Sequence, residues 1–202
     1  MRYWQHWDNL ENSKIIDKYW TARESGFRKR VAADIIEKLG AGISILEVGC
    51  GSGLIYEEMN KSRIVNEDTY VGGDVSKEML SIARVRFPKV SFVDLDIFNL
   101  PYPDSSQENV ICIQVLQHLP EYVTPMEELL RITKNHLYVV TWFVKEEEDN
   151  IRFIDVPLEG CEGKGYNNRY SMKKFKRFLS EKGVQNVEIS GLGNPCSVTI
   201  RK

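Results

Sequence analysis

The chain has 202 residues and a formal net charge of −2, with 42% hydrophobic and 28% charged residues. This length and balance predict a single globular domain over residues 1–202 and exclude a disordered or strongly basic chain. No apolar run approaches the roughly 20 residues that cross a bilayer, and residues 1–8 lack the apolar stretch of a signal peptide. We therefore expect a cytoplasmic protein with no membrane partner.

The four cysteines are scattered along the chain and form no C-x-x-C pair. That spacing predicts neither a disulfide framework nor a structural zinc site, and no metal ion is expected. The near-neutral composition disfavours a nucleic-acid partner, although the basic run Lys173–Arg177 leaves one open. The sequence gives no indication of the oligomeric state.

In chain order, residues 1–40 precede the first predicted strand and are interpreted as a helical cap. Within this segment Phe27, Val31, Ile35 and Leu39 recur every four residues, which predicts an amphipathic helix.

After this cap, short β-rich apolar runs alternate with amphipathic stretches, as in a sheet layered with helices. We predict five strands at residues 44–48, 70–74, 91–93, 109–115 and 137–143, then a hairpin of residues 187–190 and 197–201 that turns through 191–195. The fold class is therefore α/β, a three-layer doubly wound and mostly parallel seven-stranded sheet with an antiparallel last strand.

Two later helices have predicted ends. Thr124–Glu127 is interpreted as a capping box with proline at the first helical position. Ser171 is expected to cap a helix that ends at Gly183 and buries Phe175, Phe178 and Leu179.

A glycine loop, Gly49-Cys50-Gly51-Ser52-Gly53, stands between the first strand and a helical pattern. Asp74 ends the second strand, about 25 residues after Gly49. A strand-to-helix turn with an acid at the neighbouring strand end is typical of nucleoside binding in doubly wound folds. The dinucleotide fingerprint G-x-G-x-x-G does not fit, because its sixth position is Leu54 or Tyr56.

Four motifs in order resemble those of the class I S-adenosylmethionine-dependent methyltransferases. They are Glu47–Gly53, Gly73–Leu80, Asp96–Tyr102 and Asn109–Leu119, and they lie within residues 43–143. No N-P-P-Y tetrapeptide follows the fourth strand, which disfavours amino-methylation of bases or glutamine by that motif.

The resemblance implies S-adenosylmethionine as cofactor and assigns roles to single residues. Gly49, Cys50 and Gly51 would line the methionine portion, with Glu47 ordering the loop, and Gln114 would lie near that portion. The resemblance also implies that Asp74 would hold the ribose and that Val75 and Ile97 would contact the adenine ring. Asp96 would face the adenine amino group.

Each of these positions also has a purely structural reading. The glycines could serve only a tight turn, Asp74 could cap a helix, Asp96 could be a turn acid, and Gln114 a plain loop residue.

The aromatic residues of the first segment could close over the site as a lid or pack on the sheet. We choose Tyr19 as the cofactor contact from this segment. Arg23, Arg28 or Arg30 could reach the methionine carboxylate.

His118 is the catalytic candidate, as a general base after the fourth strand; its alternative is a positional, hydrogen-bonded histidine. Residues 145–169 form an insertion expected to overhang the acceptor pocket, where Tyr166 and Arg169 are the predicted substrate contacts. The alternative for this insertion is a surface hairpin with a solvated acidic run.

The predicted function is S-adenosylmethionine-dependent methyl transfer to an unidentified acceptor, a small molecule rather than tRNA or protein. A module that binds the cofactor without catalysis is the alternative from a different class, and a nicotinamide-dependent oxidoreductase is disfavoured by the glycine spacing.

Overall fold

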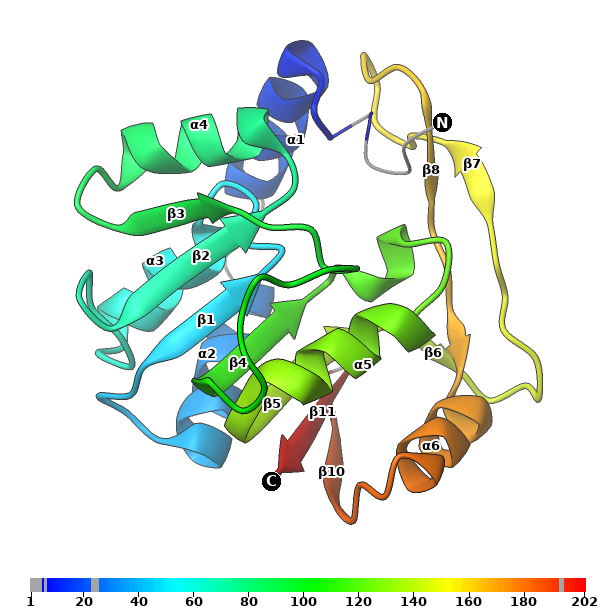
Figure 1. Ribbon diagram of the computed structural model, residues 1–202. Helices are drawn as coiled ribbons and strands as arrows, with labels where there is room; N and C mark the ends of the chain where they lie inside the picture. The colour runs from blue at the N-terminus through cyan, green and yellow to red at the C-terminus, as the bar shows by residue number, and fades with distance from the viewer. Residues whose placement is uncertain (1–4, 6, 23–25, 193–194) are drawn as a thin grey trace.

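The computed structural model describes residues 5, 7–22, 26–192 and 195–202 (Figure 1). The helices are α1 (Leu10–Ala22), α2 (Gly26–Leu39), α3 (Leu54–Lys61), α4 (Lys77–Arg86), the short 3-10 turn η1 (Leu116–His118), α5 (Val123–Ile132) and α6 (Met172–Glu181). The strands are β1 (Ile45–Val48), β2 (Tyr70–Asp74), β3 (Ser91–Asp94), β4 (Gln107–Ile113), β5 (Thr133–Thr141), β6 (Phe143–Val144), β7 (Phe153–Asp155), β8 (Lys164–Tyr166), β9 (Tyr170–Ser171), β10 (Asn186–Gly191) and β11 (Cys196–Arg201).

Seven strands form the central sheet in the order β10-β11-β5-β4-β1-β2-β3. The pairs from β5 through β3 are parallel, whereas β11 runs antiparallel to both β5 and β10. The predicted fold class is confirmed. The order reverses between β1 and β4, so the carboxyl ends of these two strands border the crevice where doubly wound folds bind ligands.

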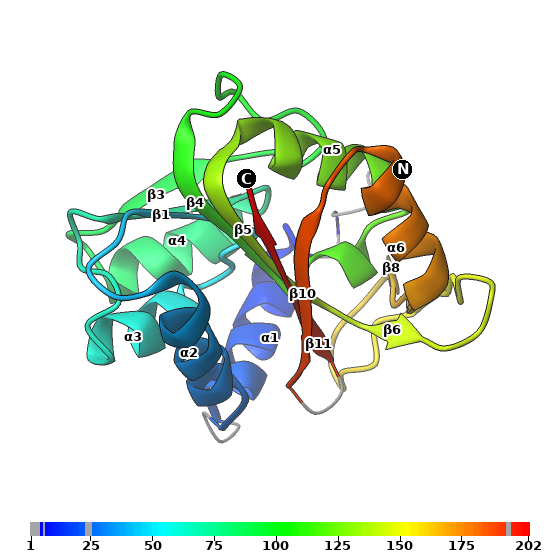
Figure 2. The ribbon, with the colours of Figure 1, turned by 90° about the horizontal axis from the view of Figure 1, so that it is seen from below.

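Helices cover both faces of this sheet, with α5 and α6 on one side and α2 and α3 on the other (Figure 2). Alternate side chains of each strand enter two separate cores: Leu46 and Val48 of β1 join the α5–α6 core, and Ile45 joins the α2–α3 core. Because both faces are buried, the strands are apolar without polar alternation.

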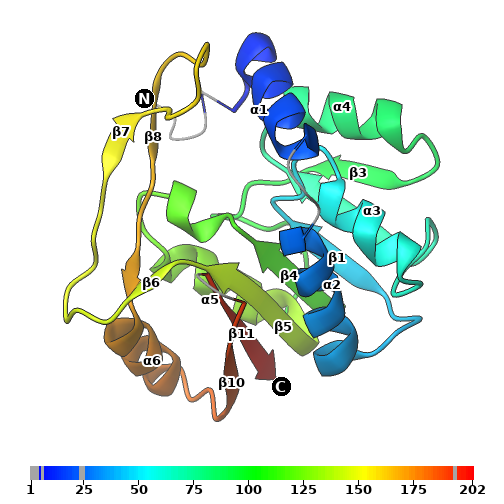
Figure 3. The ribbon, with the colours of Figure 1, turned by 180° about the vertical axis from the view of Figure 1, so that it is seen from behind.

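The helix predicted from the four-residue repeat is α2, whose Val31 and Ile35 are fully buried against the sheet. It is therefore a layer helix of the domain. Helix α1 takes a different place, between α4 and the β7–β8 ribbon (Figure 3).

The predicted capping box is wrong. Helix α5 begins at Val123, so Thr124 lies inside the helix and is not its cap; the Glu121 carboxylate before the helix accepts from the backbone N–H groups of Val123 and Thr124. Pro125 lies in the first turn of the helix, where its missing N–H leaves no intrahelical bond unmade. By contrast, Ser171 does accept from Lys174 N–H, and Gly183 follows α6 with φ 71°.

The predicted ends of two strands are also corrected. Residues 114 and 115 leave β4, because Gln114 adopts φ 58° and the chain enters η1. Strand β5 begins at Thr133, directly after α5, without a separate loop. The turn predicted over residues 191–195 includes 193 and 194, which lie outside the described residues.

The insertion at residues 145–169 is held together by backbone pairing between its own two arms. Asn150 and Arg169 pair backbone to backbone, and β7 pairs with β8 farther out. The acidic run within it is not simply solvated: Glu147 and Glu148 form ion pairs with Lys173 and Lys174 at the start of α6. Carboxylates at a helix N-terminus also interact favourably with its dipole.

Among the described residues, no helix combines the length and apolar character needed to cross a membrane.

Candidate active site

The glycine loop leaves β1 at its carboxyl end and is tied back to β2. The N–H groups of Gly49 and Cys50 both donate to the carbonyl of Gly73, at 2.7 and 2.9 Å. Gly49 and Gly51 have φ angles of 85° and 53°, which side chains other than glycine rarely adopt. The bare backbone of this loop therefore forms one wall of the crevice.

Two of these glycines differ in what surrounds them. A Cβ on Gly49 would lie 2.1 Å from Cγ2 of Val115, so the loop packs directly against the turn that follows β4. A Cβ on Gly51 would meet no protein atom within 4 Å. Gly49 is required for packing, whereas Gly51 leaves open space on the cavity side.

Asp74 connects the loop with the start of α4. Its Oδ2 accepts from Gly51 N–H at 2.8 Å and its Oδ1 from Ser76 N–H at 2.9 Å. The helix cap itself is Ser76, whose hydroxyl accepts from Met79 N–H. Burial raises the pKa of Asp74. Since each carboxylate oxygen can accept two hydrogen bonds, Asp74 retains capacity for a ligand.

Glu47 is a buried carboxylate on the same wall. The hydroxyl of Tyr70 donates to its Oε2, and burial raises the pKa of Glu47 to about 8. Burial likewise raises the pKa of the Cys50 thiol well above its usual range, which disfavours the reactive thiolate form.

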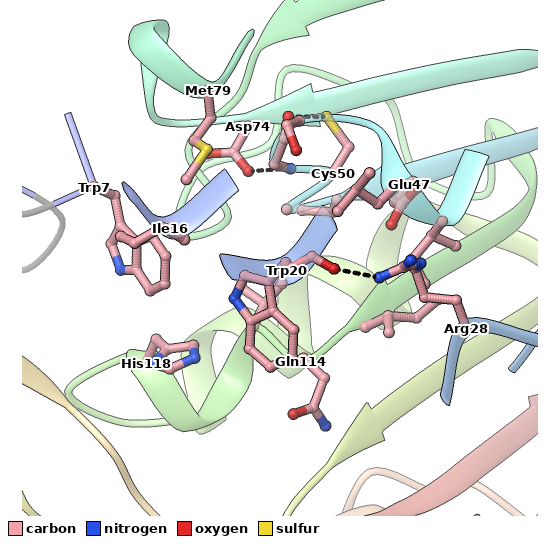
Figure 4. Close-up of a pocket in the computed structure, with 18 of the residues that line it drawn as sticks. Trp7, Ile16, Trp20, Arg28, Glu47, Cys50, Asp74, Met79, Gln114 and His118 are labelled. Atoms are coloured by element: carbon pink, nitrogen blue, oxygen red, sulfur yellow. Dashed lines mark hydrogen bonds between the residues drawn. The ribbon is translucent and has the colours of Figure 1, made fainter. Parts of the chain in front are cut away.

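These walls enclose a cavity of about 670 Å³, within the usual size range of small-molecule sites (Figure 4). The predicted site residues that line it are Glu47, Gly49, Cys50, Gly51, Asp74, Val75, Ile97, Gln114 and His118. The structure thus brings together residues that are scattered over 72 positions, from 47 to 118, at the carboxyl edge of the sheet.

Four predicted residues lie outside this lining. Tyr19 packs on Trp20, which does line the cavity, with ring centroids 5.3 Å apart. Asp96 is exposed, and its Oδ1 accepts from Phe98 N–H at 3.0 Å, the geometry of a turn.

The two predicted substrate contacts, Tyr166 and Arg169, do not line the cavity but touch residues that do. The guanidinium of Arg169 lies 5.5 Å from the ring of Trp142, a lining residue, and the carbonyl of Tyr166 contacts His118.

Sequence reasoning missed other lining residues, among them Trp7, Ile16, Trp20, Met79 and Trp142. The aromatic content of the first segment did point to part of this set. Trp142, however, follows the fifth strand without any motif that would mark it.

Gln114 stands at the end of β4 with two anchored contacts. Its Oε1 accepts from the indole Nε1 of Trp142 at 2.8 Å and from Nε2 of Gln117 at 3.0 Å. An indole nitrogen can only donate, so the oxygen of Gln114 must face Trp142. Its amide nitrogen is buried and has no hydrogen-bond partner within the described chain.

His118 lies below Trp7, and the two rings make an edge contact with centroids 5.1 Å apart (Figure 4). Its Nδ1 is 3.0 Å from the carbonyl oxygen of Tyr166. A carbonyl only accepts, so Nδ1 carries the hydrogen and the neutral ring has its lone pair on Nε2. Burial lowers the pKa of His118, which favours this neutral form.

The residues before and within α1 are fixed across the mouth of the crevice. The hydroxyl of Ser76 donates to the carbonyl of Trp7 at 2.6 Å, and Lys77 N–H donates to Asp8 at 2.8 Å. Arg86 donates to Asp17 at 2.8 and 3.0 Å and also to the carbonyl of Ser52. Residues 7–22, which we call the N-terminal roof, are thus attached to α4 and to the turn before it, and through Arg86 to the glycine loop.

The donor set suits an adenosyl amino acid. The open space at Gly51 and the carboxylate of Asp74 are on one side. Arg28 and Gln114 also line the cavity, and the Nε of Arg28 and the amide nitrogen of Gln114 are buried without a hydrogen-bond partner in the described chain. Such buried donors are costly unless a ligand or water accepts from them. Of the other two arginines proposed for this role, Arg30 lines the cavity and Arg23 lies outside the described residues.

Fold and site together define an α/β domain with a crevice at the switch point of its sheet, where doubly wound folds bind ligands. Residues 46–141 match the model of the methyltransferase domain. The chain is 29% identical over 131 residues to trans-aconitate 2-methyltransferase of Azoarcus sp. (strain BH72), covering 62% of this chain and 46% of that protein.

Another relative is the tRNA (carboxymethyluridine(34)-5-O)-methyltransferase of Arabidopsis thaliana, with 28% identity over 171 residues, 80% of this chain and 40% of that protein. The chain thus spans less than half the length of both curated relatives. Among solved structures it is similar to a SAM-dependent methyltransferase from Aquifex aeolicus, with a TM-score of 0.65, 22% identity and coverage of 93% and 96%.

A second similar fold is magnesium protoporphyrin IX methyltransferase from Synechocystis PCC 6803 with bound SAM, with a TM-score of 0.60, 14% identity and coverage of 87% and 80%. The part of the chain that contains the glycine loop, Asp74 and His118 is therefore similar to a methyltransferase domain, and the solved structures share its fold.

Proposed function

We propose that this protein transfers a methyl group from S-adenosylmethionine to a small-molecule acceptor, with His118 as general base. The observation that carries the proposal is the shared cavity of about 670 Å³. It contains the glycine loop and Asp74 at one end and the free lone pair of His118 at the other.

In this proposal the residues at the carboxyl ends of β1 and β2 would hold the cofactor. Asp74 would accept hydrogen bonds from the ribose hydroxyls, and Val75 and Ile97 would flank the adenine. The backbone of Gly49–Gly51 would line the amino-acid portion. Arg28 and Gln114, whose buried nitrogens have no partner in the described chain, supply donors for the carboxylate of the cofactor.

When bound, S-adenosylmethionine would supply a methyl group on a positively charged sulfur, and the carbon–sulfur bond would break as the acceptor bonds to that carbon. His118 Nε2 takes the proton from the attacking atom as the new bond to carbon forms, and the Tyr166 carbonyl stabilises the resulting charge on Nδ1–H. Trp7, Trp20 and Ile16 exclude water from the reacting groups. Positioning within the cavity therefore supplies much of the rate enhancement.

A small acceptor fits the covered site better than RNA does. The N-terminal roof is tied to Ser76 and Arg86, and the basic residues Lys173 and Lys174 are already paired with carboxylates. The Arabidopsis relative makes tRNA the second candidate, since that similarity extends over 80% of this chain. A neutralised surface predicts little salt-dependent RNA affinity.

The test has two stages. Calorimetry with S-adenosylhomocysteine is expected to give micromolar or tighter binding. Absence of binding to folded protein would overturn the assignment of the site.

Transfer of a labelled methyl group is then followed in a small-metabolite extract and in total tRNA. Label in small molecules that disappears in His118→Ala supports the proposal, whereas label in tRNA supports the second candidate. Cofactor binding with label in neither fraction would favour a module without catalytic activity.

We place this activity in the cytoplasm. All four cysteines are free thiols, and Cys50 and Cys112 are buried. Unpaired cysteines are typical of a reducing compartment.

A further inference from the structure

The turn that carries His118 is held by a segment about 50 residues later in the chain. Asn168 N–H donates to the carbonyl of Gln117 at 2.9 Å, and the Asn168 side-chain nitrogen donates to the carbonyl of Leu119 at 2.8 Å. The two bonds therefore bracket His118 on both sides. Between them, Nδ1 of His118 meets the carbonyl of Tyr166.

The side-chain amide of Asn168 is held in one orientation. Its Oδ1 accepts from Arg152 N–H at 2.9 Å, so the amide orientation is fixed by a backbone donor at one end and a backbone acceptor at the other. The residue has 0% exposure, so water cannot replace a lost bond without rearrangement. The neighbouring Tyr170 hydroxyl donates to the carbonyl of Leu116 at 2.6 Å and fixes the start of the same turn.

The position of this turn decides which nitrogen of His118 is basic. An unconstrained histidine side chain favours the hydrogen on Nε2. The tautomer is reversed when Nδ1–H has a fixed acceptor, as Tyr166 provides here. If the turn moved away from β8, the lone pair would no longer be held on the nitrogen that is free to serve the cavity.

We propose that Asn168 is a positioning residue that, with the Tyr166 carbonyl, holds His118 with its Nε2 lone pair available to the acceptor. The 145–169 insertion would then affect methyl transfer by fixing the tautomer of His118. This inference rests on the proposed function for the use of that lone pair, but the tautomer can be measured without any acceptor.

The chain contains a matched control for the measurement. Nδ1 of His136 lies 2.9 Å from Oδ1 of Asn109, and the Asn109 side-chain nitrogen donates to the carbonyl of Ser44 at 2.9 Å. This second buried asparagine holds a second histidine in the same tautomer, at the opposite end of the sheet. Burial lowers the pKa of both histidines, so both rings are neutral at about pH 8.

The experiment is nitrogen-15 NMR of labelled histidine rings at that pH, with and without S-adenosylhomocysteine. In the wild-type protein we expect the directly bonded proton on Nδ1 of His118 and of His136. In Asn168→Ala the Nδ1–H signal of His118 is expected to disappear, with nitrogen shifts moving toward a mixture of tautomers, while His136 is unchanged. Asn109→Ala should give the reciprocal result.

Asn168→Asp covers the case in which the alanine variant does not fold. It keeps the oxygen that accepts from Arg152 but lacks the donor to Leu119, and the His118 signals should move in the same direction as in Asn168→Ala. A wild-type His118 protonated on Nε2 would overturn the inference, and so would an unchanged His118 in a folded Asn168 variant. Either result with intact S-adenosylhomocysteine binding would leave the methyltransferase assignment standing, since that assignment fails only when the cofactor product does not bind.

Discussion

The two ends of the cavity are built in different ways. At the end proposed for the cofactor, backbone groups and one carboxylate come from the ends of adjacent parallel strands, and the turn of Gly49 and Gly51 bonds directly to that of Asp74. At the end proposed for the acceptor, Trp7, His118 and Trp142 are side chains from three distant parts of the chain. The first end is built mainly from two neighbouring strands and the turns that follow them, whereas the second depends on contacts between distant segments, which a single substitution can release.

The largest effect is expected at the junction of the two ends. Gly49→Ala places a Cβ 2.1 Å from Val115 in a backbone with φ 85°, so the loop must move. We expect a loss of about 3 kcal/mol in the free energy of unfolding and at least a roughly 1000-fold loss of S-adenosylhomocysteine affinity, measured by denaturant melts and calorimetry.

Gly40→Ala is the control, since Gly40 has φ 95° but no atom within 4 Å of its added Cβ. It should cost about 1 kcal/mol of stability and leave affinity unchanged. Equal effects of the two substitutions would show that strain alone, and not packing against Val115, makes Gly49 necessary.

Asp74→Asn tests the carboxylate at the cofactor end. Loss of charge-assisted hydrogen bonds to the ribose should weaken binding by about 100-fold. The loss should be equal for S-adenosylhomocysteine and for 5′-methylthioadenosine, which lacks the amino-acid portion. Asp96→Asn, at an exposed turn, should change neither affinity, and a selective loss of S-adenosylhomocysteine in Asp74→Asn would contradict the ribose assignment.

Glu47 predicts a pH dependence of stability. Its pKa rises from the ordinary value of 4.5 to about 8 on folding because the carboxyl is buried. A folded-state pKa above the unfolded value gives stability that is fully present below pH 4.5 and is lost as pH rises toward 8. This group should therefore lower the free energy of unfolding by on the order of 2 kcal/mol between about pH 6 and pH 8.

Glu47→Gln keeps an oxygen for the Tyr70 hydroxyl but removes the titration. Its melting curves should be flatter over this pH range than those of the wild-type protein. Identical pH profiles would mean that Glu47 keeps an ordinary pKa in the folded state.

The smallest effect is expected at the roof. Asp17→Asn weakens a partly exposed ion pair with Arg86, which is worth about 1 kcal/mol or less. We expect S-adenosylhomocysteine to dissociate about 3-fold faster in stopped-flow measurements, because α1 covers the crevice less firmly. Glu57→Gln removes an exposed pair with Lys61 on α3 and should leave the rate unchanged. Equal rates in all three proteins would show that the Arg86 tie does not retain the ligand.

The same contrast explains which residues could be predicted from the sequence. The glycine loop directly follows the apolar strand β1, and Asp74 is the last residue of β2. The pattern of strands and the spacing of these motifs were therefore enough to predict that both lie in one crevice. Tyr19 was predicted to contact the cofactor, but its neighbour Trp20 lines the cavity. Which of the two faces the cavity depends on the rotation of α1 about its axis, and two adjacent aromatic residues do not specify that rotation. Asn168 gave no sequence signal, because its role arises only when its loop returns to the turn after β4.

The sequence by itself determined the layered sheet and the glycine loop with Asp74 at its carboxyl edge, from which the cofactor class is proposed, because strand and helix periods and a glycine loop are local properties of the chain. Only the tertiary structure decided which tryptophans close the cavity, which nitrogen of His118 is free, and that the acidic run pairs with α6. Those features depend on contacts between residues far apart in the chain, and such contacts exist only after the sheet has brought the segments together.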